Sequence, residues 1–233
     1  LIIMKKLILL LFIPLVFTCS DDSSDDNFYV DPNAGENPVY LDSNGVTVKA
    51  KDWCNGGESG YINGIQYFVV SGSILPPPPY ESNRRWCTTL ITDMSYAFKN
   101  IDLNHNDWYE YEDAYFPGVR EWDVSNVTDM RQMFYNTNAL SQLSSGDIFS
   151  YWDVSNVTDM ERMFARSPIA FNPDISSWDV SNVTDMFGMF YNECGFPGSY
   201  NQDLSGWDVS NVEFCGQFSG GQLNWDLPKP NFI

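Results

Sequence analysis

Oxygen donors that could hold a metal ion are concentrated in one segment of this 233-residue chain. Residues 102–113 have the spacing of a twelve-residue calcium loop, in which positions 1, 3, 5, 7, 9 and 12 supply the ligands. Those positions hold Asp102, Asn104, Asn106, Trp108 (through its carbonyl), Glu110 and Asp113. Calcium is therefore the one candidate cofactor. The sixth position is not Gly and the twelfth is Asp rather than Glu, so the alternative is an acidic loop without a metal, which these departures favour.

Side chains for catalysis are scarce. His105 is the only His in the chain, so a Ser-His-Asp or Cys-His site would have to use it, and no nucleophile motif accompanies it. The sequence has no glycine-rich loop for phosphate. We therefore expect no enzyme activity. The formal net charge of −19 would repel nucleic acid, so no nucleic-acid partner is expected either.

Several aromatic residues are candidates for contact with a partner. Exposed aromatic rings beside acidic groups can stack on sugars or anchor a protein. The candidates are Trp108, Tyr109, Tyr111, Tyr115 and Tyr151. The alternative, which we favour, is that these rings pack an insertion against the rest of the protein.

The framework that would position these groups is a sequence repeat. The pattern W-D-V-S-N-V-T-D-M-x-x-M-F occurs at 122–134, 152–164 and 178–190, and weaker copies occupy 86–98 and 207–219. The Trp residues that begin the copies lie 26 to 36 residues apart, a period typical of stacked repeat proteins. Alternation before the Trp favours a short strand, and the spacing of the Met and Phe residues favours a short helical turn. We predict a leucine-rich-repeat-like right-handed solenoid, mainly β with short helical turns, preceded by a small β module. The expected core residues are Trp122, Met130, Phe134, Trp152, Met160, Phe164, Trp178, Met186, Phe190 and Trp207.

The polar positions of the repeat should form rows along such a stack. One row would contain Asp123, Asp153, Asp179 and Asp208, and a second would contain Asn126, Asn156, Asn182 and Asn211. Such rows could bind cations or glycans, but Asp and Asn also bond to backbone groups at tight turns. We favour the structural role for both rows.

The chain outside the repeats divides by composition. A basic and then apolar N-terminus is typical of a signal peptide, and Thr18 before Cys19 resembles a bacterial lipidation site at Cys19. The alternative is an ordinary secretory signal that is cleaved nearby. The acidic run after Cys19 predicts a solvated tether, and Asn63-Gly64 predicts a β-hairpin. The expected divisions are a lipoprotein signal peptide (1–18), an acidic flexible tether (19–37), a small β-rich module (38–72), a proline-rich connector (73–85), the repeats (86–219) and a C-terminal tail or cap (220–233).

The remaining cysteines are even in number. An even number of cysteines in an exported protein suggests disulfides. We predict the pairs Cys54–Cys87 and Cys194–Cys215, with the other connectivities or free thiols as alternatives.

The repeats resemble those of the BspA-like bacterial surface lipoproteins, whose leucine-rich-repeat-related units carry the same thirteen-letter pattern. The resemblance covers roughly residues 39–219, although the chain has only about five repeats and its proline-rich connector departs from the usual one. It implies a protein held in the outer membrane by a lipid anchor, facing the cell exterior, that binds a macromolecular partner in adhesion or protein interaction. The ligand, a protein or a glycan, is not identified. The alternatives are a glycan-binding accessory lipoprotein and a purely structural surface spacer.

Overall fold

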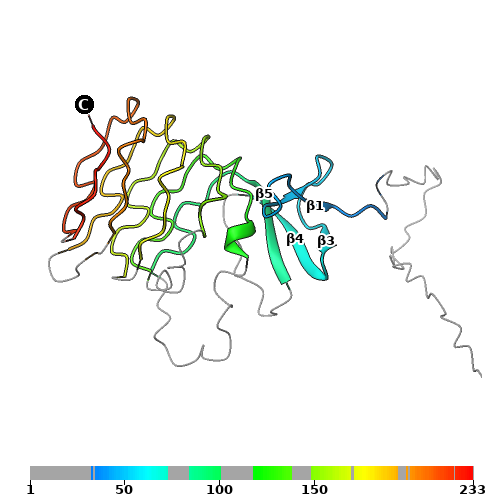
Figure 1. Cartoon of the computed structure of the whole chain (residues 1–233). Coiled ribbons are helices and arrows are strands. Elements are labelled where there is room, and N and C mark those ends of the chain that lie inside the picture. Colours follow the sequence, from blue (N-terminus) through cyan, green and yellow to red (C-terminus); the bar gives the residue numbers. More distant parts are fainter. Residues whose placement is uncertain are drawn as a thin grey trace, which may run out of the picture. The chain divides into compact units, whose positions relative to one another are not determined.

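The computed structural model describes residues 33, 35–72, 84–100, 118–137, 148–168, 171–193, 198, 200–222 and 224–232 (Figure 1). The chain divides into two compact units, residues 1–34 and 35–233, and all described residues except Asn33 lie in the second. That unit is mainly β, which confirms this part of the prediction. The helical structure in the described part is one short 3-10 helix, η2 (Val119–Glu121). No helix among the described residues has the length and apolar character needed to cross a membrane.

The second unit begins with a two-stranded ribbon. Strand β1 (Val39–Leu41) pairs antiparallel with β2 (Val48–Ala50). The turn between them closes where the Gly45 N–H donates to the Asp42 carbonyl at 2.9 Å, and Gly45 has a φ of 72°. The predicted turn at these residues is therefore present, because Gly adopts a positive φ without steric cost.

A three-stranded sheet follows the ribbon. Strands β3 (Ser59–Ile62) and β4 (Ile65–Gly72) form the predicted hairpin, in which Asn63 and Gly64 both have positive φ, as a two-residue type I′ turn requires. Strand β5 (Arg84–Ile91) pairs parallel with β4. The buried core shared by both sheets contains Val39, Val48, Ala50, Cys54, Tyr67, Val69 and Cys87.

Strand β5 connects this module to the repeats. Cys87 packs in the module core, whereas Ile91, at the end of the same strand, packs in the repeat core. The strand begins at Arg84, within the segment that was predicted as a connector. Strand β5 therefore belongs both to the first, weak repeat and to the module's sheet. Its side chains pack in both cores.

Successive repeats lie side by side in chain order (Figure 1). Parallel β-bridges join Asp93 to Asp129, Asp129 to Asp159, Asp159 to Asp185, and Asp185 to Phe214. Backbone hydrogen bonds link the same neighbours; the Met130 N–H, for example, donates to the Asp159 carbonyl at 2.9 Å. Neighbouring repeats thus provide hydrogen-bond partners for each other's backbone groups.

The segment that follows each Asp-Met pair is not helical, so the predicted short helical turns are wrong for the described repeats. In the second repeat two consecutive turns replace the helix: Met133 N–H donates to the Met130 carbonyl, and Tyr135 N–H to the Gln132 carbonyl, both at 3.1 Å. Gln132 has a φ of 52°, which no right-handed helix contains. Its own N–H donates to the Glu161 carbonyl of the next repeat at 2.8 Å. A helix would have used that amide within its own repeat, so bonding between repeats replaces helix formation.

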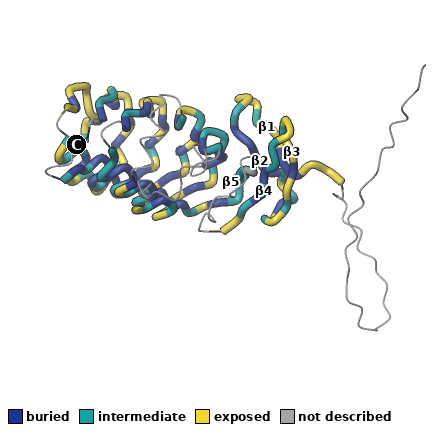
Figure 2. The backbone as a smooth tube through the Cα atoms, turned by 90° about the horizontal axis from the view of Figure 1, so that it is seen from below, coloured by how far each residue is buried: buried dark blue, intermediate teal, exposed yellow. Residues whose placement is uncertain are grey.

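Two aromatic columns fill the repeat core. The indole rings of Trp122, Trp152 and Trp178 stack with their centroids 6.3 Å apart at each step and nearly parallel planes. A second column stacks Phe98, Phe134, Phe164 and Phe190. All ten residues expected in the core are buried, and Figure 2 shows buried positions recurring along each repeat. Aromatic burial along the whole stack therefore supplies much of its hydrophobic stabilisation.

The C-terminal residues cover the last repeat. Ser219 stands where other repeats have the Phe of the second column, and Trp225 packs on Phe190 instead, with ring centroids 5.2 Å apart. Phe232 packs on Phe218 at 5.0 Å, and the Leu204 N–H donates to the Pro228 carbonyl at 2.9 Å. The tail thus closes the end of the aromatic core.

Candidate functional site

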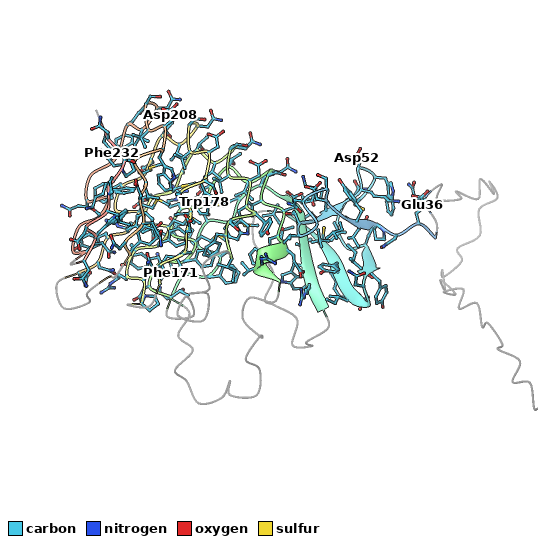
Figure 3. The ribbon with its side chains drawn as sticks, in the orientation of Figure 1. Glu36, Asp52, Phe171, Trp178, Asp208 and Phe232 are labelled. Carbon is cyan, nitrogen blue, oxygen red and sulfur yellow. The ribbon has the colours of Figure 1, made fainter. Side chains whose placement is uncertain are left out.

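The Asp and Asn side chains of the polar rows form hydrogen bonds with backbone groups. The Asp179 carboxylate accepts from both the N–H and the hydroxyl of Ser181, at 3.1 and 2.7 Å. The Asn182 side chain donates to the Ser155 carbonyl of the preceding repeat at 2.7 Å. Equivalent Asn bonds recur at Asn126, Asn156 and Asn211. Figure 3 shows Asp208, of the same Asp row, at the outer edge of the stack. These contacts favour the structural role of the rows.

A second row of carboxylates, not noticed in the sequence, lies on the bridged positions of the repeats. Arg131 bridges two of them, with N–O distances of 2.8 Å to Asp129 and 3.5 Å to Asp159. Burial raises the pKa of Asp159, and the charges of Asp129 and Asp185 add to this effect. Within the described residues no group of His, Cys, Asp and Glu side chains is arranged to hold a metal ion.

The positions that vary between repeats gather on one side of the stack. They are the two x letters of the pattern and the two residues after its Phe, and they lie in the consecutive turns. We call this side the turn face; it comprises residues 95–96, 99–100, 131–132, 135–136, 161–162, 165–166, 187–188, 191–192, 216–217 and 220–221. Because the invariant letters build the core and the turns, the turn face is where each repeat differs from its neighbours.

Cations and aromatic rings alternate on the turn face. The Lys99 ammonium lies 4.9 Å from the Tyr96 ring centroid and 5.3 Å from that of Tyr135. The Arg162 guanidinium lies 5.0 Å from the Phe187 ring centroid. Four of the 12 Lys and Arg residues of this acidic chain are here: Lys99, Arg131, Arg162 and Arg166. The turn face thus offers positive charge and aromatic surface together.

A hollow of about 610 Å³ opens on the turn face. Its volume falls in the range typical of small-molecule sites, roughly 300–1,000 Å³. The lining residues are Lys99, Gln132, Tyr135, Arg162, Phe187, Tyr191, Glu193 and Gln217. All five repeats contribute side chains to this lining, from their turns or from the residues just after them. The hollow is therefore a product of the stacking.

The comparisons with known proteins concern this repeat region. Residues 105–224 match the family described as "Mycoplasma protein of unknown function, DUF285". The match spans 120 of the 233 residues, since 224 − 105 + 1 = 120. The chain belongs to the DUF285 family. No curated protein and no solved structure matches the chain.

Most site residues predicted from the sequence lie outside the described part of this DUF285 protein. Cys19, Tyr115 and the whole calcium-loop candidate at 102–113 lie outside it. That loop also contains His105 and the candidate aromatics Trp108, Tyr109 and Tyr111. Tyr151 is described and half-buried, with the Arg120 guanidinium 4.6 Å from its ring centroid. Tyr151 does not line the hollow.

The predicted Cys54–Cys87 disulfide is absent, because both residues are free thiols. The Cys54 thiol donates to the Pro38 carbonyl at 3.4 Å and the Cys87 thiol to the Val48 carbonyl at 3.6 Å. Burial raises the pKa of Cys87 to about 11 and also raises that of Cys54, so neither thiol ionises readily. Cys215 is likewise a free cysteine, and its predicted partner, Cys194, lies outside the described residues.

A partly buried polar cluster joins the β module to the DUF285 repeats. The Tyr67 hydroxyl donates to Glu121 Oε2 at 2.6 Å, and the Arg85 guanidinium pairs with the other oxygen of Glu121. Burial and the Glu121 carboxylate raise the pKa of Tyr67. The three residues come from β4, β5 and η2, so no local sequence pattern predicts that they meet. Their enclosed geometry makes this cluster a structural joint.

Proposed function

We propose that this protein is a lipid-anchored cell-surface protein of the BspA-like type, which binds a macromolecular partner through its turn face and performs no catalysis. The observation that carries the proposal is that different positions of the repeat build the framework and the exposed surface. The invariant letters are buried or bonded to backbone, and the varying letters lie together around a hollow. A constant framework with variable side chains on one side is how repeat proteins build extended binding surfaces.

The finer architecture belongs to the same proposal. We infer that the repeats form a leucine-rich-repeat-like right-handed solenoid. Support comes from the parallel bridges between consecutive repeats and from the two continuous aromatic columns. Each repeat alone exposes its Trp, Met and Phe side chains, and stacking buries them.

The location is proposed from the N-terminal sequence. Lys5 and Lys6 precede an apolar run that leads to Thr18 and Cys19, and the acidic residues that follow resemble an export signal to the outer face of the outer membrane. Membership of the DUF285 family is compatible with a surface protein. Lipid at Cys19 would tether the repeats to the membrane, with the acidic run as a spacer.

Of the alternatives, the exposed aromatic surface of the turn face favours a binding role over a purely structural spacer. A spacer needs only a polar, featureless surface, whereas Tyr96 is 45% exposed on the turn face and lies beside the cations of Lys99 and Arg131. Glycan binding remains a specific form of the proposal.

Two measurements test the proposed function. Protease shaving of intact cells should remove the protein, and full protection in unbroken cells would overturn the surface location. Binding of the mature chain to host or neighbouring cells should fall at least tenfold with Lys99→Ala combined with Tyr135→Ala. The matched control is Tyr61→Ala, because Tyr61 is 59% exposed on β3, in the β module. Equal loss in both variants, or in neither, would contradict a role for the turn face.

A further inference from the structure

Four of the repeats hold an Asp carboxylate against the backbone of the following turn. The Asp185 carboxylate accepts from the N–H of Phe187, two residues further along the chain, at 2.8 Å. The same bond, at 2.8 to 2.9 Å, recurs at Asp93, Asp129 and Asp159. The fifth repeat has Phe214 at this position, and a Phe side chain accepts no such bond. The fifth repeat therefore lacks the carboxylate that the other four carry.

The turn itself is formed in the fifth repeat as in the others. Three positions after the Asp or Phe, the backbone has a φ of 50° to 60° in every repeat; these residues are Tyr96, Gln132, Arg162, Gly188 and Gln217. Phe214 also pairs with Asp185 in a parallel bridge, as the Asp residues pair with one another. The backbone that holds a carboxylate elsewhere is thus already formed without one.

Three consecutive amides of this last turn are unpaired. We call the N–H groups of Cys215, Gly216 and Gln217 the amide cradle; they donate to no acceptor within the described residues. In the fourth repeat the equivalents of the outer two, Met186 and Gly188, donate to carbonyls of the fifth repeat at 2.8 and 2.9 Å. Consecutive amides around a residue with positive φ form a concave site for an anion or a carbonyl oxygen.

The amide cradle is open to solvent. Gly216 and Gln217 are exposed, and the Phe214 side chain next to them in the chain is 57% exposed. The tail residues Trp225 and Phe232 pack on the aromatic core, and Figure 3 shows Phe232 at the same end of the stack. Free donors and an exposed ring therefore occur together on the last repeat.

These groups select a ligand that accepts hydrogen bonds. The carbonyls of Cys215 and Gln217 already accept from amides of the same turn, at 3.2 and 3.0 Å, so the free groups of the cradle are donors. A carboxylate only accepts, and its bonds to N–H groups are stronger than those of neutral acceptors. The neighbouring carboxylates of Asp185 and Glu213 oppose a further negative charge, so the ligand also needs apolar contact. The ring of Phe214 offers that contact.

We propose that the amide cradle binds a carboxylate of a partner protein, supplied by an acidic side chain or by a chain end, while an apolar side chain of the partner packs on Phe214. The carboxylate takes the place that the Asp185 carboxylate has in the fourth repeat. This site uses backbone amides at the end of the stack, whereas the turn face uses side chains along it, so the proposal goes beyond the function proposed above.

The test uses the mature chain and three short peptides with the same apolar residues. The first has a free C-terminal carboxylate, the second has an amidated C-terminus and an internal Asp, and the third is amidated and has no acidic group. Titration followed by NMR should shift the amide resonances of Cys215, Gly216 and Gln217 with an acidic peptide and not with the uncharged one. The tighter of the two acidic peptides shows whether a chain end or a side chain is preferred.

Substitutions of Phe214 separate the cradle from the ring. Phe214→Asp restores the residue that the other repeats carry, so we expect a folded protein whose own carboxylate fills the cradle and whose affinity for the acidic peptides falls about tenfold or more. Phe214→Asn fills the cradle without adding charge and gives the same test if Phe214→Asp does not fold. Phe214→Ala removes the ring and leaves the cradle empty, so it should bind more weakly but still prefer the acidic peptides. Tyr61→Ala is the control and should bind as the parent does.

The outcomes also separate this site from the turn face. Binding of an acidic peptide that Phe214→Asp abolishes and Phe214→Ala only weakens supports the cradle. Absence of peptide binding, equal binding of the uncharged peptide, or equal losses in Phe214→Asp and Phe214→Ala overturn it. Lys99→Ala combined with Tyr135→Ala should leave peptide binding unchanged, and a loss in that variant would assign the peptides to the turn face instead.

Discussion

At the scale of single residues, Trp178 shows how an invariant letter of the repeat contacts the repeat before it. Trp178 is buried, stacks on Trp152, and donates its indole N–H to the Phe149 carbonyl at 3.0 Å. Figure 3 shows its side chain inside the stack. The same indole bond recurs from Trp152 to the Val119 carbonyl at 2.9 Å. One side chain therefore fills the core and joins two repeats.

Replacing this side chain should be costly. Trp178→Ala should lower the free energy of unfolding by about 3–5 kcal/mol, since it removes a large buried ring and leaves a cavity. Trp178→Phe should cost less, because it keeps one buried ring; it loses part of the indole volume and the N–H that satisfies the Phe149 carbonyl, and an unsatisfied carbonyl costs about 1–3 kcal/mol. Urea denaturation followed by circular dichroism measures both. An unchanged midpoint for Trp178→Ala would show that the column does not stabilise the stack.

At the scale of the repeat element, Asp179 and Asp159 respond to pH in opposite directions. Hydrogen bonds from Ser181 lower the pKa of Asp179, so its contribution to stability is present above the unfolded pKa of about 3.9 and is lost as the pH falls below it. Burial raises the pKa of Asp159, so its contribution is present below the unfolded pKa and is lost as the pH rises through the folded pKa.

Replacing Asp by Asn at positions 179 and 159 should therefore have opposite effects on stability at pH 7. Asp179→Asn should destabilise the protein, and Asp159→Asn should stabilise it, because Arg131 keeps its closer partner Asp129. Both differences should shrink as the pH is lowered towards 3. Urea midpoints measured from pH 3 to 7 check this, and equal signs at pH 7 would contradict the assigned environments.

The repeat also shows what its sequence could predict. The strands β1 and β3–β4 follow from alternation and turn residues, and the buried positions follow from the pattern itself. The helical turn was a wrong prediction because Met130, Met133 and Phe134 are spaced for one face of a helix, yet consecutive turns bury the same three residues. Periodicity reports which side chains are inside, and it does not report whether the amides between them bond within a repeat or across repeats.

The candidate site was harder to predict than the fold. The turn face consists of the letters that vary between repeats, so a search for residues that recur in every repeat does not find it. The hollow combines one to three side chains from each of five repeats, so the set can be recognised only when the register of the stack is known. The tyrosine–glutamate–arginine cluster at Glu121 joins residues from three elements and had no signal at all.

At the scale of the whole repeat unit, the tail replaces a missing repeat. Trp225 packs on Phe190 and Tyr200 with centroid distances of 5.2 and 4.8 Å, and its indole N–H donates to the Gln202 carbonyl at 3.0 Å. Trp225→Ala should therefore cost about 3–5 kcal/mol, like the loss of a core aromatic. It should also open the end of the stack and increase binding of a hydrophobic dye. Leu227→Ala is the control, because Leu227 is 43% exposed and should change neither quantity.

The stack as a whole predicts that a repeat can be removed. Deleting residues 152–177 joins Tyr151 to Trp178, and both the lost and the following segment begin with the same W-D-V-S-N-V-T-D-M letters. If each repeat depends only on its neighbours, Trp178 takes the place of Trp152 and its indole bonds to the Val119 carbonyl. We expect a chain that still unfolds cooperatively, with a lower urea midpoint because one layer of both aromatic columns is gone. Because the deletion also removes Arg162, which lines the hollow, it should weaken binding there while Trp fluorescence still reports a folded core. A chain that cannot fold would mean that contacts beyond nearest neighbours hold the repeats, which contradicts a solenoid.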